Sequence, residues 1–162
     1  FQESITATRA RISRLLSGRG KRTPTSFHRE LGELMIEACG MSRSEEGLKA
    51  GLARIPELRE QFYRDVAVPA NGSMATALEY AGRVADFLEF AEVMCHDALM
   101  RDESCGAHFR VEHQTDDGEA VRDDENYCTV SAWEFRGIDE TPHLHVEPLD
   151  MENVELAVRN YQ

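Results

Sequence analysis

The sequence has no long hydrophobic run. None of its 162 residues falls in a stretch approaching the roughly 20 apolar residues that a membrane-spanning helix requires. It also has no signal-peptide pattern and does not begin with Met, so we expect a fragment of a longer protein. The four cysteines are scattered without a CxxC pair, which is typical of reduced thiols. These absences predict a cytoplasmic protein with no direct membrane span, in which two of the cysteines face a helical core.

Nucleotide-binding loops are missing as well. The chain contains no GxxxxGK[ST] phosphate loop and no GxGxxG following a strand. The segment "GRGKRT" at 18–23 has a similar composition, but neither the preceding strand nor the spacing. The residues therefore predict no phosphate-binding site.

The negative charge is unevenly distributed. Residues 1–66 carry 12 Lys and Arg against 9 Asp and Glu, whereas residues 67–162 carry 6 against 21, and the whole chain has a net charge of −12. An acidic surface repels phosphates, so we do not expect nucleic-acid binding. A basic stretch in the first part fits either a solvated helix face or a local contact with a partner. It consists of Arg9, Arg11, Arg14, Arg19, Lys21 and Arg22.

Helical spacing of apolar residues dominates the first two thirds of the chain. One run covers residues 1–16 and ends before Gly18 and Gly20. A second begins at the Thr and Pro of "TPTSFHRELGELMIEACG" and stops at Gly40. These two segments are predicted helices.

Two further helices are predicted between residues 44 and 100. Ser44 followed by two glutamates opens the third, and Pro56 predicts a kink or break near Ile55. Asn71 or Ser73 caps the fourth and longest helix. The apolar stripe of this helix comprises Met74, Leu78, Ala81, Ala85, Leu88, Cys95 and Leu99.

The predicted fold class is mainly α: an antiparallel helix bundle of three to four helices, spectrin-repeat-like, over residues 1–103. Periodicity changes after Arg101. In residues 104–162 the segments "YCTVSAWEF" and "HLHVEPL", joined by "RGIDETP", predict a small β-hairpin after an irregular loop. An isolated hairpin is marginal in water, so we expect this tail to pack on the bundle as part of one structural domain.

The chemistry-bearing residues gather in "RDESCGAHFRVEH", residues 101–113. Cys105 and His108 have the CxxH spacing, and His143 and His145 form HxH, but zinc sites commonly show CxxC or HxxxH spacing. A nucleophilic Cys105 with His108 as base would need oxyanion donors and an orienting acid or amide, and neither is evident. Metal binding and catalysis are both disfavoured here.

A structural role fits the same stretch better. A chain that turns at Gly106 and returns at Gly118 would bring Arg110 to Asp123 or Asp124, and an Arg–carboxylate fork would fix the loop. We expect His108 to hydrogen-bond the backbone in that turn.

The stretch also carries a family resemblance. Residues 103–126, "ESCGAHFRVEH…DGEAVRDDEN", resemble the ESRGAHxRxD…RDDENW signature of succinate dehydrogenase and fumarate reductase flavoprotein subunits. The upstream "LGELMIEACGMSRSEEGLKAGLARIPELREQF" is similar to the helical C-terminal domain of that family, which carries Met-x-x-x-x-Gly-x-x-Arg. Cys105 stands where the motif has Arg, and Tyr127 where it often has Trp. The Cys form resembles the menaquinone-type branch rather than the mitochondrial type.

The resemblance implies a parent oxidoreductase of electron transport and the tricarboxylic acid cycle that interconverts succinate and fumarate with FAD. In that family the FAD site and the dicarboxylate-binding residues lie upstream, so we expect this piece to be inactive alone, with no catalytic, FAD-binding or metal residues. Its implied partners are the FAD-binding domain of the same subunit and the iron–sulfur subunit, at the cytoplasmic face of the inner membrane.

The basic 9–22 segment and the Ser104–Arg110 turn are our candidates for contacts with those partners. The alternative is a freestanding helical interaction module with a metal site made from Cys105, His108, His143 and His145. The structural and interface candidates of the tail are Ser104, Gly106, His108, Arg110, Arg122, Asp123 and Asp124.

Overall fold

The computed structural model describes residues 1–69, 74–137 and 140–157. They form two compact units, Phe1–Arg122 and Asp123–Gln162. The first is helical and the second carries a short helix and a two-stranded sheet, so the predicted mainly α class with a small hairpin is confirmed. The loop 104–122 belongs with the helices and not with the hairpin.

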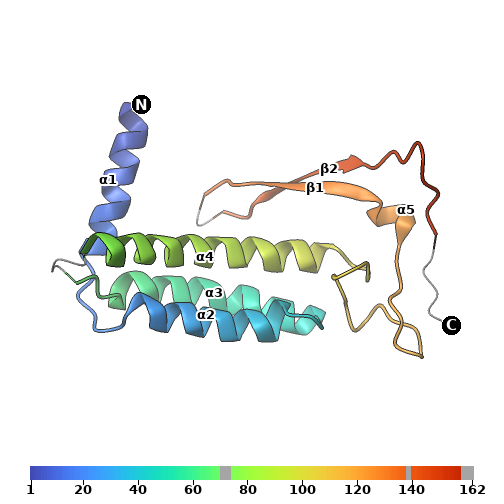
Figure 1. Ribbon diagram of the computed structural model, residues 1–162, viewed down its shortest axis with the longest axis horizontal. Coiled ribbons are helices and arrows are strands. Elements are labelled where there is room, and N and C mark those ends of the chain that lie inside the picture. Colours follow the sequence, from blue (N-terminus) through green and yellow to red (C-terminus); the bar gives the residue numbers. More distant parts are fainter. Residues whose placement is uncertain (70–73, 138–139, 158–162) are drawn as a thin grey trace. The chain divides into compact units, whose positions relative to one another are not determined.

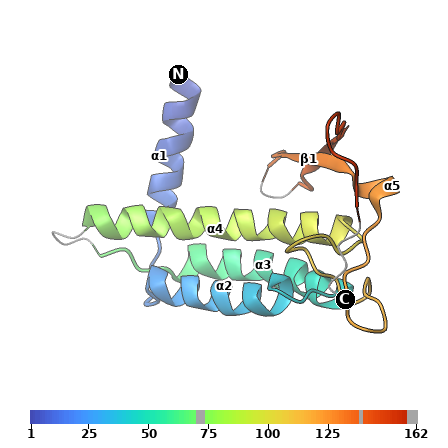
Figure 2. The same cartoon turned by 45° about the vertical axis from the view of Figure 1, so that its right-hand side comes forward.

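Three helices of the first unit pack side by side, and a fourth stands away from them. α2 (Pro24–Cys39), α3 (Glu45–Asp65) and α4 (Met74–Met100) run antiparallel in sequence order (Figures 1 and 2). α1 (Gln2–Leu16) meets the bundle only at its C-terminal end, while its N-terminus points away (Figures 1 and 2). The bundle is therefore three-helical, with one projecting helix.

The helix ends follow the sequence signals. The Thr23 side chain accepts a hydrogen bond from the Ser26 amide, Pro24 occupies the first turn of α2, and Gly40 follows its last residue. The Ser44 hydroxyl accepts from the Gly47 amide and caps α3 in the same way. Asn71 and Ser73, the predicted caps of α4, lie outside the described residues.

The break predicted near Ile55 is wrong: α3 continues through Pro56 to Asp65. Ile55, Leu58 and Phe62 follow one face of this helix and are fully buried. Burying these side chains contributes several kcal/mol on the usual scale of about 1.5–3 kcal/mol each, which offsets the roughly 3 kcal/mol that an interior proline costs.

The core lies between α2, α3 and α4. Phe27 and Phe62 meet edge to face with ring centroids 5.3 Å apart. Cys39 and Cys95 are buried with free thiols, as expected of two core-facing cysteines. The remaining α4 core residues are mostly small, which lets the helices approach closely; they are Ala81, Val84, Ala85, Leu88, Ala91 and Ala98.

The chain between α1 and α2 passes close to the end of α3. A Cβ atom at Gly20 would lie 1.8 Å from the Asp65 carbonyl oxygen, so only glycine fits there. Arg22 forms a parallel bridge with Val66, donating its amide to the Asp65 oxygen. Gly20 therefore serves a close backbone approach, whereas α1 already ends at Leu16 with Ser17 as its C-cap.

The second unit contains α5 (Asp124–Tyr127), β1 (Thr129–Glu134) and β2 (His143–Pro148). The strands are antiparallel, with Trp133 opposite Leu144. The packing of this hairpin on the bundle stays a prediction. Among the helices of the described residues, none combines the length and apolar character needed to cross a membrane.

Candidate functional site

The loop after α4 is a pair of tight turns, as the glycine positions predicted. Cys105 and His108 exchange backbone hydrogen bonds of 2.8 and 3.1 Å around Gly106, which has a φ of 61°. The second turn closes at Gly118, with a φ of 82° and its amide donating to the Thr115 oxygen. Both glycines occupy left-handed backbone that other residues disfavour.

A buried serine fastens the first turn. Ser104 has no exposed surface, and its hydroxyl accepts the Arg110 amide at 2.8 Å. The same hydroxyl donates to the Arg110 carbonyl oxygen at 3.1 Å. The Ser104 hydroxyl thereby holds the two ends of the turn, residues 104 and 110, together as both acceptor and donor.

The Arg110 side chain is 2% exposed and caps the end of α4. Its Nη1 donates to the Ala98 carbonyl oxygen at 3.2 Å, where helices normally leave acceptors unsatisfied. Its ion-pair partners are Asp102 at 3.3 Å and Glu112 at 3.1 Å. The predicted pairing with Asp123 or Asp124, which belong to the second unit, stays a prediction.

The two aspartates have other places. Asp123 is the N-cap of α5, where its side chain accepts the Asn126 amide at 3.1 Å. Asp124 is the first residue of that helix, and Arg122 precedes the cap at the junction of the two units.

His108 joins two segments through its ring. Nε2 lies 2.8 Å from the Arg101 carbonyl oxygen, and Nδ1 lies 2.7 Å from Nη1 of Arg43. Because a guanidinium only donates, Nδ1 must accept and Nε2–H must donate, which fixes a neutral tautomer. Burial, with the charges of the nearby arginines, lowers the pKa of His108 below its ordinary value, although the bond to Arg101 opposes this. The expected hydrogen bond of His108 to backbone is confirmed.

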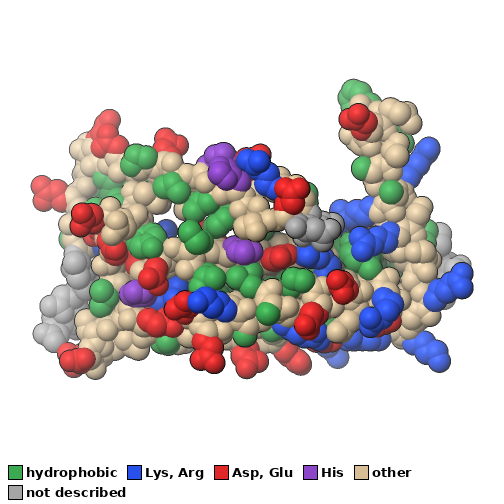
Figure 3. Space-filling model, turned by 180° about the vertical axis from the view of Figure 1, so that it is seen from behind, with side chains coloured by type: hydrophobic (Ala, Val, Ile, Leu, Met, Phe, Trp, Pro, Cys, Tyr) green, Lys and Arg blue, Asp and Glu red, His purple; other side chains and the backbone are tan. Residues whose placement is uncertain are grey.

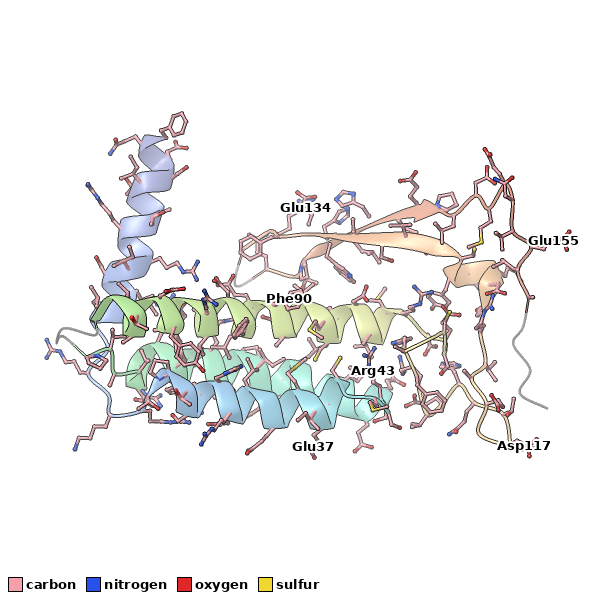
Figure 4. All side chains as sticks on the ribbon, viewed as in Figure 1. Glu37, Arg43, Phe90, Asp117, Glu134 and Glu155 are labelled. Atoms are coloured by element: carbon pink, nitrogen blue, oxygen red, sulfur yellow. The ribbon has the colours of Figure 1, made fainter. Side chains whose placement is uncertain are left out.

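Arg43, between α2 and α3, is the residue that reasoning from the sequence missed (Figure 4). Its amide donates to the Phe109 oxygen at 3.0 Å, and its own oxygen accepts from Val111 at 2.9 Å. Its Nε donates to the Gly40 oxygen at 3.0 Å. The signal was present, since Gly40 and Arg43 end the family pattern Met-x-x-x-x-Gly-x-x-Arg. We call the set Arg43, Arg101, Asp102, Glu103, Ser104, His108, Arg110 and Glu112 the Arg110 cluster.

Two acids complete the Arg110 cluster. Glu103 is 2% exposed and pairs with Arg101 at 2.7 Å. The Glu112 carboxylate accepts the Glu45 amide at 2.7 Å at the start of α3. Although partial burial opposes it, that bond and the guanidinium of Arg110 lower the pKa of Glu112. The cluster therefore ties the loop to the α2–α3 turn, to the start of α3 and to the end of α4.

The hydrogen bonds and ion pairs of the Arg110 cluster favour a structural role over catalysis or metal binding. Both ring nitrogens of His108 are engaged, so a metal would have to displace Arg43 or the Arg101 carbonyl. Within residues 1–69, 74–137 and 140–157, no group of three or more His, Cys, Asp or Glu is placed to hold a metal ion. On the hairpin, the ring of His145 instead bonds Glu134 at 2.8 Å.

Half of the basic 9–22 segment is engaged inside the first unit. Arg11 pairs with Asp86, and Arg14 lies 3.7 Å above the Tyr63 ring. Arg22 pairs with Glu30 at 2.7 Å and stacks on Phe27. Arg11 and Arg14 are exposed, as the solvated-face interpretation predicts, but these three arginines also link α1 and the following loop to the bundle.

Comparison with known proteins matches this architecture to one family. The family described as "Fumarate reductase flavoprotein C-term" matches residues 28–161. The fumarate reductase flavoprotein subunit of Escherichia coli is 30% identical over 151 residues, and that of a Serratia species is 32% identical over 153. Each match covers 93% of this chain and 24% of the relative, so the chain spans about a quarter of their length.

Solved structures give the same result. A flavoprotein chain of E. coli quinol fumarate reductase superposes with a TM-score of 0.79 at 28% identity, covering 97% of this chain and 26% of that one. A chain of the Mycobacterium smegmatis Sdh1 complex superposes with a TM-score of 0.70 at 23% identity. The match covers 91% of this chain and 24% of the Sdh1 chain, and it shows a shared fold.

Proposed function

Because this chain belongs to the fumarate reductase and succinate dehydrogenase flavoprotein family, as its C-terminal domain, we propose that it supports assembly of the FAD-binding part of its subunit with an iron–sulfur subunit. The proposal rests on the way in which the Arg110 cluster fixes the signature loop to the bundle. The family signature lies in a loop in which Arg110, Glu112 and His108 hold the α2–α3 turn, the start of α3 and the end of α4 together. A domain built in this way offers a rigid surface to partners.

The residues of this chain do not fit FAD. Dinucleotide-binding folds hold the pyrophosphate between parallel strands at a helix N-terminus, and the sheet of the described residues is one antiparallel hairpin. We assign FAD, and the interconversion of succinate and fumarate, to the part of the subunit outside this chain. The proposal extends to the menaquinone-type branch and to a place at the cytoplasmic face of the inner membrane, reached through partner subunits.

Association with the FAD-binding part is the direct test. The purified chain would be titrated by calorimetry into the separately produced FAD-binding portion of the subunit, after circular dichroism has established that both are folded. We expect saturable one-to-one binding. Absence of heat and of co-elution, with both components folded, would refute an assembly role.

The alternative of a freestanding metal-binding module has less support. Its four ligands would include His108, whose nitrogens already bond Arg43 and Arg101. Elemental analysis of the same purified sample addresses it: stoichiometric zinc, together with a melting temperature lowered by chelator, would favour the module.

A further inference from the structure

A groove runs along α1 and into the corner where this helix meets α4. Its outer part, about 360 Å³, is lined by Phe1, Ser4, Ile5, Thr8 and Arg9. Its inner part, about 530 Å³, continues from Thr8 to the first turns of α4. The inner walls are Arg11, Ile12, Leu15, Leu78, Glu79, Gly82, Arg83 and Asp86. Thr8 is common to both parts, so they form one surface.

The surface of the groove is mostly apolar, and the groove is open in the described residues of the first unit. Ile5 is 44% exposed and Ile12 is 39% exposed, whereas Leu15 alone of α1 is buried. An isolated helix of about 15 residues is marginal in water, and the N-terminal half of α1 points away from the bundle (Figure 1). An apolar line on a helix so placed indicates a surface that another polypeptide covers.

Gly82 lies on the inner wall of the groove, within α4. A Cβ atom there would have nothing within 4 Å, so no neighbour in the described residues requires glycine. A helix-interior glycine costs about 1 kcal/mol relative to alanine. Gly32 of α2 is equally open but does not line the groove, which makes it a matched control.

The charge around the groove differs from that of the chain. α1 carries Arg9, Arg11 and Arg14 with a single acid, Glu3, in a protein of net charge −12. Figure 3 shows Lys and Arg side chains gathered at the end of the bundle from which α1 projects. Arg9, at the outer part of the groove, has no ion-pair partner among the described residues. In the inner wall Arg11 and Arg83 pair with Asp86 and Glu79, so the surface complementary to the groove is apolar with a carboxylate opposite Arg9.

We propose that this groove is the docking surface for the FAD-binding part of the same subunit, which inserts an apolar segment flanked by acidic residues between α1 and α4. The inference rests on the proposed function and deepens it by naming the surface. The occupant is chosen because the chain spans only about a quarter of its relatives, so most of the accompanying polypeptide of such a subunit lies outside it. A second copy of the chain is the rival occupant.

Hydrogen exchange tests the docking surface. Amide exchange would be compared between the isolated chain and the complete flavoprotein subunit that contains it. We expect residues 2–16 and 78–86 to exchange at least about tenfold more slowly in the complete subunit, because covering α1 suppresses its local opening. The Gly82→Trp variant fills the groove and should return residues 2–16 toward the rate of the isolated chain, whereas Gly32→Trp should leave the protection intact.

The outcomes separate the groove from the assembly role. Protection elsewhere on the bundle without protection of residues 2–16 would refute the groove and leave the assembly role standing. No protection anywhere in the chain would refute both. Concentration-dependent dimerisation of the isolated chain that Gly82→Trp abolishes, with no protection in the subunit, would assign the groove to a second copy and overturn the proposal.

Discussion

Nη1 of Arg43 donates to Nδ1 of His108 at 2.7 Å, across 65 positions of sequence. The contact joins the turn between α2 and α3 to the loop that carries the family signature. Because the other ring nitrogen of His108 donates to the Arg101 carbonyl, a single imidazole links the α2–α3 turn to the chain that follows α4, at one end of the bundle. Four predictions concern this link and the helix packing around it.

Replacing Arg43 by alanine should destabilise the chain by about 1–3 kcal/mol, because the Gly40 carbonyl and His108 Nδ1 both lose a donor. Urea unfolding followed by circular dichroism measures this. Arg29→Ala is the control, since Arg29 is exposed on α2 and makes no ion pair in the described residues. Equal midpoints for the two variants would contradict the role given to Arg43.

Stability should fall as the pH drops below about 6.5. The pKa of His108 is lower in the folded chain than the ordinary 6.5. As the pH falls below 6.5, the unfolded chain therefore binds more protons than the folded chain, and the free energy of unfolding decreases. The carboxylates with lowered pKa values, Glu30 and Glu112, lose their contribution only below about 4.5.

The His108→Gln variant tests the source of this dependence, because glutamine keeps a donor and an acceptor but does not titrate. Unfolding free energies measured from pH 5 to 7.5 should slope less in the variant than in the parent. An unchanged slope would assign the dependence to another group.

Arg110→Ala should be the most damaging of these substitutions, because it removes a buried guanidinium and leaves the end of α4 without its donor. The loss should be about 3 kcal/mol, at the low end for a broken buried ion pair, since Asp102 and Glu112 are partly exposed and keep His113 and the Glu45 amide as partners. Arg136→Ala, on the exposed ion pair with Glu134, should cost less than about 1 kcal/mol. Thermal unfolding of both variants gives the comparison, and similar losses would be inconsistent with the burial of Arg110.

The glycines of the helices should respond oppositely to alanine. Gly51→Ala places a Cβ atom 2.9 Å from that of Ala38, so α2 and α3 must separate and stability must fall. Gly82→Ala and Gly32→Ala meet nothing within 4 Å and should each stabilise the isolated chain by up to about 1 kcal/mol. Melting temperatures that fail to order the three variants in this way would overturn the packing argument.

The local structure was accessible from the sequence because its signals are local. Thr23, Ser44 and Gly40 mark helix ends whose caps depend on residues three or four positions away. The β-branched and aromatic residues of "YCTVSAWEF" and the polar–apolar alternation of "HLHVEPL" likewise identified the two strands. The helix break predicted at Pro56 failed because burial of the α3 side chains in the core, which a local rule does not include, offsets the cost of the proline.

The partners within the site were not accessible in the same way. Arg110 pairs with Asp102 and Glu112, which the sequence did not indicate as its partners. The predicted meeting of Arg110 with Asp123 or Asp124 joins residues of the two units and stays a prediction. The packing of the hairpin on the bundle, which is a question of the same long-range kind, stays a prediction.

The sequence by itself determined the helices, the hairpin, the turns at Gly106 and Gly118, and the family, since each depends on short patterns of residue type. Only the tertiary structure decided that α1 projects from a three-helix bundle and that Arg43, far away in the chain, holds His108. Spacing along the chain specifies which face a side chain occupies. Which charged group it meets there depends on how the helices pack and which neighbour is closest.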